Sequence, residues 1–339
     1  MNFIIMFSKL RNSVIAQLKN DREFSLFLIV GVFLGIAAGI FTCIFPNYLH
    51  EFYGLSLAQR GLLETPRESA GIVVVLVVGF LSFSGDIRIA RVTMWLNVIG
   101  LFGFTLFAPP SPGRDSITAL MVLWLIVYSL GQHIYIPLAP KIGMDLSKSA
   151  SYGARLARYN AYLLGGTLAG AVFTLVCWLV FSVGYQALFL IASTSYLLAS
   201  FTMFFMKPDK KPKVKRPKFV FRKKYMLYYV LNLTNGGRKQ IFLTFAPYVL
   251  ITVFNYSLPA MAVLFVVITL VQMLTRRFVG HAIDTVGEQK VLTAEAAFLL
   301  LICFGYGLTG YFFNASITAA VIVVCYVIDS SMSVVEMAR

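Results

Sequence analysis

The residues of this sequence best suited to chemistry are charged side chains inside otherwise apolar stretches. Arg238 and Lys239 stand about 13 residues into one such stretch, shortly after Asn235, and Asp329 stands inside another. A charge in apolar surroundings is costly, so these side chains should face protein or water. They suit the binding of a small solute or a coupling ion. The alternatives are a structural ion pair or a lysine that reaches for the membrane interface.

A second group of charges, Arg60, Glu64, Arg67 and Glu68, has the spacing of one helix face. These side chains suit a gate, or a carboxylate that binds and releases a proton. The alternative is a ladder of ion pairs in which each charge satisfies its neighbour. His133 is a further candidate, either as a hydrogen-bonded structural residue or as a proton relay.

The sequence lacks the motifs of the common catalytic and metal-binding sites. It contains no phosphate-binding loop, no His-Glu-x-x-His and no Gly-x-Ser-x-Gly pattern. The three histidines, His50, His133 and His281, stand in different segments, and the four cysteines lie inside apolar runs without a Cys-x-x-Cys spacing. We therefore expect no catalytic residue, no metal and no cofactor, and the chain is not expected to be an enzyme.

The elements that hold these charges are predicted to be helices that cross a membrane. Hydrophobic residues make up 59% of the chain, charged residues 13%, and the mean hydropathy is +0.80, whereas a soluble domain has roughly 25% charged residues. Lipid offers the backbone no hydrogen-bonding partner, so each apolar segment of about 20 residues should be helical. Ten segments qualify, at 24–46, 60–84, 92–109, 116–138, 160–182, 185–206, 225–254, 258–275, 291–312 and 315–337.

The positive charges predict the orientation of these helices. With the N-terminus in the cytoplasm, 24 of the 29 Lys and Arg residues fall in cytoplasmic segments, as positive-inside topology requires. The stretch 207–224 alone holds ten of them against one acid. This pattern indicates a connection beside anionic lipid rather than nucleic-acid binding. A multi-pass protein of the plasma (inner) membrane is therefore expected.

The segments divide into four regions. We expect a cytosolic N-terminal segment at 1–23, a six-helix bundle at 24–206, a basic cytoplasmic linker at 207–224 and a second bundle of about four helices at 225–339. The second bundle is shorter than the first, which predicts a truncated twelve-helix protein, with a natural ten-helix architecture as the alternative.

The segment after the eighth predicted helix carries a short motif. Gly280, Asp284 and Gly287 are spaced as Gly-x-x-x-Asp-x-x-Gly, which resembles the signature of the major facilitator superfamily between the second and third helices of each half. The counterpart in the first half is degenerate, although Asp86 and Arg88 stand close to it. The resemblance implies that these five residues form a conformational gate.

The resemblance also implies a fold and an activity. The fold would be an all-α transmembrane helix bundle with two pseudo-symmetric halves, in which the seventh helix, with Arg238, lines a central cavity. The activity would be secondary transport of a small solute by alternating access, with proton-coupled efflux as one form of it. The expected partners are a small-molecule substrate, the lipid bilayer and protons. A polytopic membrane enzyme or a scaffold that transports nothing is the alternative.

Overall fold

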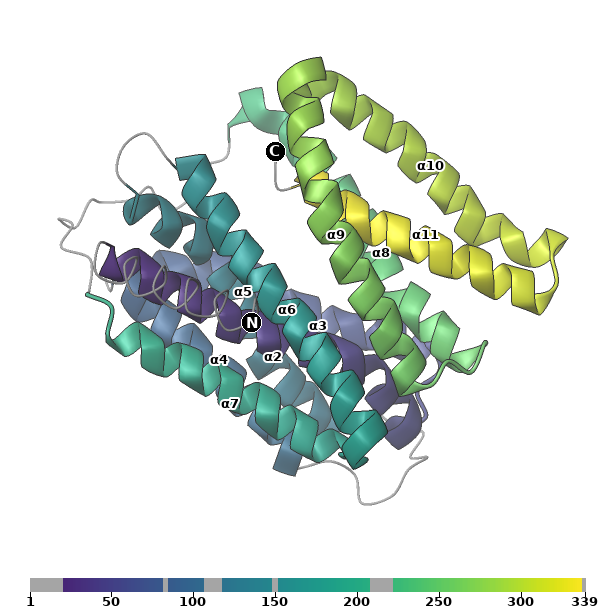
Figure 1. Ribbon diagram of the computed structural model, residues 1–339, viewed down its shortest axis with the longest axis horizontal. Helices are drawn as coiled ribbons and strands as arrows, with labels where there is room; N and C mark the ends of the chain where they lie inside the picture. The colour runs from purple at the N-terminus through teal and green to yellow at the C-terminus, as the bar shows by residue number, and fades with distance from the viewer. Residues whose placement is uncertain (1–20, 82–84, 107–117, 148–151, 208–221, 337–339) are drawn as a thin grey trace, which may run out of the picture.

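The computed structural model describes residues 21–81, 85–106, 118–147, 152–207 and 222–336. In these ranges the fold is all-α (Figure 1). The helices are α2 (Arg22–Tyr53), α3 (Leu57–Leu81), α4 (Asp86–Leu106), α5 (Ala119–Asp145), α6 (Tyr152–Phe181), α7 (Tyr185–Phe204), the short 3-10 helix η1 (Lys223–Tyr225), α8 (Met226–Thr252), α9 (Leu258–Val286), α10 (Glu288–Phe312) and α11 (Ala315–Glu336). The ten α-helices correspond one to one to the ten predicted segments.

Local signals explain where the longest helix begins and ends. Asp21 precedes α2, and its carboxylate accepts a hydrogen bond from the backbone N–H of Phe24 at 3.4 Å, which satisfies one of the free N–H groups of the first turn. Gly54 follows the helix with a φ of 55°, a left-handed conformation that favours glycine. The helix is therefore longer than the apolar segment 24–46 alone predicts.

Eight of the described helices are long and apolar enough to cross a membrane. The two long helices outside this set are α3 and α8, with 25 and 27 residues. They carry Arg60, Glu64, Arg67 and Glu68 (α3) and Arg238 and Lys239 (α8), which lower their mean hydropathy. At about 1.5 Å per residue each still exceeds the roughly 30 Å thickness of a bilayer core, and both pack against other helices of the bundle.

The predicted connection after residue 275 is wrong. Helix α9 continues to Val286, α10 begins at Glu288, and Gly287 alone separates them with a φ of 95°. The motif residues Gly280 and Asp284 therefore lie in the last turns of a helix. Hydropathy marks the part of a helix that lipid covers, and it misses the polar turns that extend into water. Of the predicted linker and the N-terminal segment, residues 208–221 and 1–20 lie outside the described ranges.

The helices form two groups that meet along a few of their members. Helices α2 to α7 gather on one side of the molecule, and α9, α10 and α11 lie on the other (Figure 1). Between the groups, α2 and α3 contact α8, while α2 and α6 contact α9. Helix α8 also contacts α11, so it connects the first group to the last helix.

Glycines let α2 and α6 approach closely. A Cβ atom on Gly166 would lie 2.3 Å from the carbonyl oxygen of Val32, and one on Gly39 would lie 2.2 Å from the carbonyl oxygen of Thr167. These distances are far below a normal contact, so only glycine fits at the crossing. The Gly166-x-x-x-Gly170 spacing is typical of such small-residue interfaces.

The two groups are joined by hydrogen bonds near the C-terminal ends of α2 and α8. The hydroxyl of Tyr248 donates to the carbonyl oxygen of Leu55 at 2.6 Å, and the side-chain amide of Asn47 donates to the carbonyl oxygen of Tyr256 at 3.3 Å. Tyr248 and Asn47 are both almost fully buried. This end of the bundle is therefore closed.

Candidate functional site

An ion pair joins α8 to α11 inside the helix bundle. The guanidinium of Arg238 donates a hydrogen bond through one of its terminal nitrogens to Asp329. Asp329 is only 3% exposed, while the side chain of Arg238 keeps 23% of its surface accessible. The pairing offsets much of the cost of burying both charges. We name it the α8–α11 ion pair.

Aromatic side chains and unused hydrogen-bonding groups surround this pair. The guanidinium of Arg238 lies over the ring of Phe242, 5.9 Å from its centroid, and Phe242 stacks on Tyr306 of α10 with the centroids 4.4 Å apart. Among the described residues, neither Nε of Arg238 nor the buried hydroxyl of Tyr306 has a hydrogen-bond partner. A buried polar group without a partner is costly, so both retain unused hydrogen-bonding capacity beside the ion pair.

The neighbours of Arg238 on α8 are placed differently. Lys239 is half-buried and adds a positive charge near Asp329. Asn235 stands in α8, but its side chain lies outside the part of the chain that the structure describes. The structure thus brings together Arg238 and Asp329 from the sequence-predicted set.

The charges of α3 form a continuous network. Arg60 pairs with Glu64, whose other carboxylate oxygen accepts from Nε of Arg67 at 2.5 Å. A terminal nitrogen of Arg67 reaches Glu68 at 2.8 Å. Arg60 and Glu64 are buried, and the side chain of Glu68 is 39% exposed. The predicted ladder of ion pairs is therefore present.

Two other helices extend the ladder into what we name the α3 network. From α5, a ring nitrogen of His133 lies 3.3 Å from Glu68, and the hydroxyl of Ser129 donates to the backbone carbonyl of Arg67 at 2.6 Å. From α8, the side-chain amide of Gln240 donates to Glu64 at 2.8 Å. This last bond ties the network to the second group of helices.

Helix α8 contributes one residue to each of the two ionic clusters. Arg238 and Gln240 are two residues apart, so they point to nearly opposite sides of a helix. One reaches α11, and the other reaches α3. Gln240 and Tyr306 did not emerge from the sequence, because neither carries a charge and their partners come from other helices. The run of polar residues before Gln240 in the sequence is a signal from which Gln240 could have been predicted.

The predicted gate residues lie apart from both clusters. Asp86 is buried at the start of α4 and pairs with Lys141 of α5, a partner that the sequence did not reveal. Arg88 and Asp284 are exposed. Gly280 lies in α9, and Gly287 forms the joint between α9 and α10.

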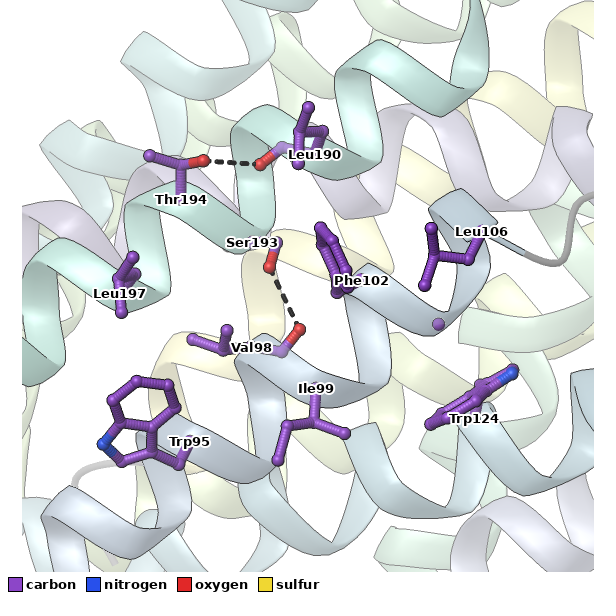
Figure 2. Close-up of a pocket in the computed structure, with 11 residues that line it drawn as sticks. Trp95, Val98, Ile99, Phe102, Leu106, Trp124, Leu190, Ser193, Thr194 and Leu197 are labelled. Carbon is purple, nitrogen blue, oxygen red and sulfur yellow. Dashed lines mark hydrogen bonds between the residues drawn. The ribbon is translucent and has the colours of Figure 1, made fainter.

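A separate apolar groove runs between α4, α5 and α7. Figure 2 shows Trp95, Phe102 and Trp124 among its lining residues, and its volume is about 480 Å³. The hydroxyls of Ser193 and Thr194 in its wall donate to backbone carbonyls of Val98 and Leu190. The wall is therefore almost entirely apolar, and none of the ionic residues described above lines it. The groove is unsuited to a polar solute.

In the part of the chain that the structure describes, long apolar helices with ion pairs buried between them are typical of a multi-pass membrane protein. It belongs to the Major Facilitator Superfamily, a family of secondary transporters, whose family model matches residues 10–337. A search among curated proteins found no match.

Solved structures with the same fold include several transporters. The nucleoside transporter NupG is 10% identical with a TM-score of 0.65, and the match covers 93% of this chain and 80% of that one. A D-xylose-proton symporter is 14% identical with a TM-score of 0.63, at 91% and 79% coverage. The E. coli fucose:proton symporter FucP is 14% identical with a TM-score of 0.60, at 92% and 82% coverage. At these identities the similarity establishes the fold alone.

Proposed function

We propose that this chain moves a small solute across a membrane by alternating access, with the solute bound at the α8–α11 ion pair. The observation that supports this site is the ion pair between Arg238 of α8 and Asp329 of α11 inside the bundle. A charge in such a place is costly and usually serves a passage or a site. Nε of Arg238 and the hydroxyl of Tyr306 lack partners beside the pair, and we infer that they bind the solute once the helices move to admit it.

The division of the chain supports the alternating-access part of the proposal. Segments 24–206 and 225–339 would be the two moving bundles, with 207–224 as the cytoplasmic linker and 1–23 as a cytosolic segment. The positive-inside count favours a cytoplasmic N-terminus in the plasma (inner) membrane. In that orientation the bonded ends of α2 and α8 lie at the outer face, so the bundle is closed to the outside.

The role proposed for the gate residues rests on the Gly-x-x-x-Asp-x-x-Gly motif. Gly280, Asp284 and Gly287 at the inner end of α9, and Asp86 and Arg88 at the inner end of α4, would control separation of the bundles on the cytoplasmic side. The buried pair of Asp86 with Lys141 joins α4 to α5 within the first bundle and so fixes the position of Asp86 at this end of it. In the second bundle, exposed Asp284 is free to engage another helix end during the cycle.

The solute site is tested with purified protein in proteoliposomes. D-xylose, fucose and nucleosides, which the names of fold relatives mention, form the first panel, and small organic anions form the second because Arg238 and Lys239 are cations. Arg238→Ala should reduce uptake of the active solute about ten- to a hundredfold, because a hydrogen bond to a charged group contributes about 1.5–3 kcal/mol. Lys290→Ala, at an exposed position of α10, is the matched control. Transport by Arg238→Ala at the level of this control would refute the site.

The proposed coupling ion is the proton. Two of the fold relatives are named as proton symporters, and the α3 network, with Glu64, Arg67 and Glu68 beside His133, provides ionisable groups that can hold one. The efflux direction expected from the sequence stays a prediction. Vesicles are loaded with solute and given an inward proton gradient. The solute should leave them faster if the protein exchanges protons for solute, and it should remain inside if protons and solute move together.

A further inference from the structure

The hydrogen bonds of His133 fix where its hydrogens lie. Nδ1 is 2.9 Å from the backbone carbonyl oxygen of Ser129 and 3.0 Å from the hydroxyl oxygen of the same residue. A carbonyl oxygen only accepts. The hydrogen of the Ser129 hydroxyl is already directed to the carbonyl of Arg67, 2.6 Å away. Both contacts at Nδ1 therefore require Nδ1 to carry a hydrogen.

The other ring nitrogen also needs a hydrogen in its contact. Nε2 of His133 lies 3.3 Å from a carboxylate oxygen of Glu68. If Nδ1 carries the hydrogen of a neutral ring, Nε2 presents a lone pair to this carboxylate oxygen, and the two atoms repel each other. A proton between them removes the repulsion. The other oxygen of Glu68 accepts from Arg67 at 2.8 Å, which keeps the carboxyl ionised. The proton therefore belongs to Nε2, and the ring is an imidazolium.

Among the described residues, no further charged group lies near enough to His133 to change this assignment of its two ring hydrogens. Helix α5 packs against α3, α4 and α6, and the charges that act on His133 are Glu68 and Arg67 of α3. A Cβ on Gly71 would approach Cδ2 of the ring to 3.2 Å, so this glycine lets the ring seat closely against α3. The charged residues of α4 and α6 that the structure describes lie near the first turns of those helices, and Lys141 of α5 lies two turns farther along.

We infer that Glu68 and His133 form the binding site of the coupling proton, and that the proton is bound in the conformation described. This inference rests on the proposed transport function. Release transfers the proton from Nε2 to water, so the pair passes from net charge zero to minus one. The side chain of Glu68 is 39% exposed, which gives water access to the contact that holds the proton.

A hydrogen-bonded path connects this proton to the second bundle. Arg67 bonds both Glu68 and Glu64, and Glu64 accepts from Gln240 of α8. When the bundles part at the outer face, Glu64 loses the hydrogen bond from the amide of Gln240, and its ion pair with Arg67 becomes stronger. The ion pair between Arg67 and Glu68 then becomes weaker, while Glu68 stays beside His133. The proton state and the position of α8 are thus coupled through three side chains.

The protonation state is read directly by nuclear magnetic resonance of the labelled ring nitrogens of the three histidines, in the full chain in lipid nanodiscs. At neutral pH both nitrogens of His133 should carry a hydrogen. In Glu68→Gln the anion is gone, and the ring should become neutral with its hydrogen on Nδ1. His281→Gln removes the signal of an exposed ring and should leave His133 unchanged. A neutral His133 in the wild type, or an imidazolium that persists in Glu68→Gln, would overturn the inference.

Transport separates this inference from the proposed function. In proteoliposomes, Glu68→Gln and His133→Gln should lose accumulation driven by a pH gradient to a greater extent than exchange of solute without a gradient. If the wild type moves no solute of the panel while His133 is an imidazolium that depends on Glu68, the proposed function fails and the pair remains a proton site without a coupling role. If both variants accumulate solute like the wild type, the coupling role is refuted and the transport function stands.

Discussion

At the scale of single residues, the ionic groups of this bundle are stabilised by partners on other helices. Asp329 is almost fully buried and depends on Arg238. A charge left alone in such a place is costly, whereas removing both members of a buried pair is often nearly neutral. A variant that lacks both members of the pair should therefore remain stable, and its transport then shows whether the pair has a functional role.

Asp329→Asn should destabilise the protein, because it leaves the guanidinium of Arg238 without its anion. Removing one partner of a buried pair costs about 3–5 kcal/mol, and the partial exposure of Arg238 favours the lower end. The double variant Arg238→Gln with Asp329→Asn should recover most of the stability and none of the transport. Thermal unfolding in detergent measures the first, and vesicle uptake measures the second. Full transport by the stable double variant would leave the pair with a structural role alone.

The sequence indicated which residues carry charge inside the membrane, but it did not determine their partners. The spacing of Arg60, Glu64 and Arg67 predicts contacts within one helix, and those contacts are present. The bond from Gln240 to Glu64 joins residues 176 positions apart. No local pattern encodes such a pairing, because it depends on how the helices are arranged.

At the scale of helices, close packing of α2 on α6 depends on glycine. Gly165 and Gly166 are neighbours on α6, yet their surroundings differ. A Cβ on Gly166 would meet the backbone of α2, with the carbonyl oxygen of Val32 at 2.3 Å, whereas one on Gly165 would meet nothing within 4 Å. Backbone atoms cannot move aside as a flexible side chain can. These two positions form a matched pair.

Gly166→Ala should lower stability by about 1–3 kcal/mol, the usual cost of overpacking, because α2 and α6 must separate to admit the methyl group. Gly165→Ala should be neutral or stabilising by about 0.4–1 kcal/mol, since alanine restricts the unfolded chain. Thermal unfolding of the two purified variants gives the comparison. Equal melting temperatures would show that the crossing is looser than its geometry indicates.

The inner end of α9 provides a second prediction at this scale. If Asp284 is part of the gate, Asp284→Asn should slow turnover several-fold while leaving the affinity for solute unchanged, because Asp284 is exposed at the end of α9 and has no part in the α8–α11 ion pair. Glu288→Gln removes a carboxylate on the other side of the joint and should have a smaller effect. Initial rates of uptake over a range of solute concentrations separate the two quantities. Unchanged turnover in Asp284→Asn would exclude a gating role.

At the scale of the whole molecule, the pattern of apolar segments predicted the order of the helices that the structure describes. It could not predict that α9 extends to Val286, because charged and polar residues such as Arg276, His281 and Asp284 lower the hydropathy of its last turns. It also could not predict which helices meet between the two groups. That arrangement follows from packing, in which α8 lies against α2 and α3 on one side and α11 on the other.

The closed end of the bundle gives a test of alternating access. Gly61 of α3 and Phe245 of α8 belong to different groups, and a Cβ on Gly61 would lie 3.0 Å from the ring of Phe245. Cysteines at both positions, in a chain whose four native cysteines are replaced by alanine, should react with a short reducible bifunctional reagent. If the groups must separate here in every cycle, the crosslink should abolish transport, and a reducing agent should restore it.

The control joins two helices of one group. Val98 of α4 and Thr194 of α7 line the same apolar groove (Figure 2), and cysteines at these positions should crosslink without loss of transport, because a rigid bundle moves as one body. Undiminished transport with Gly61 and Phe245 crosslinked would show that this end stays closed throughout the cycle. Loss of transport in both crosslinked variants would show instead that the first group deforms internally, which rigid-body motion of two bundles forbids.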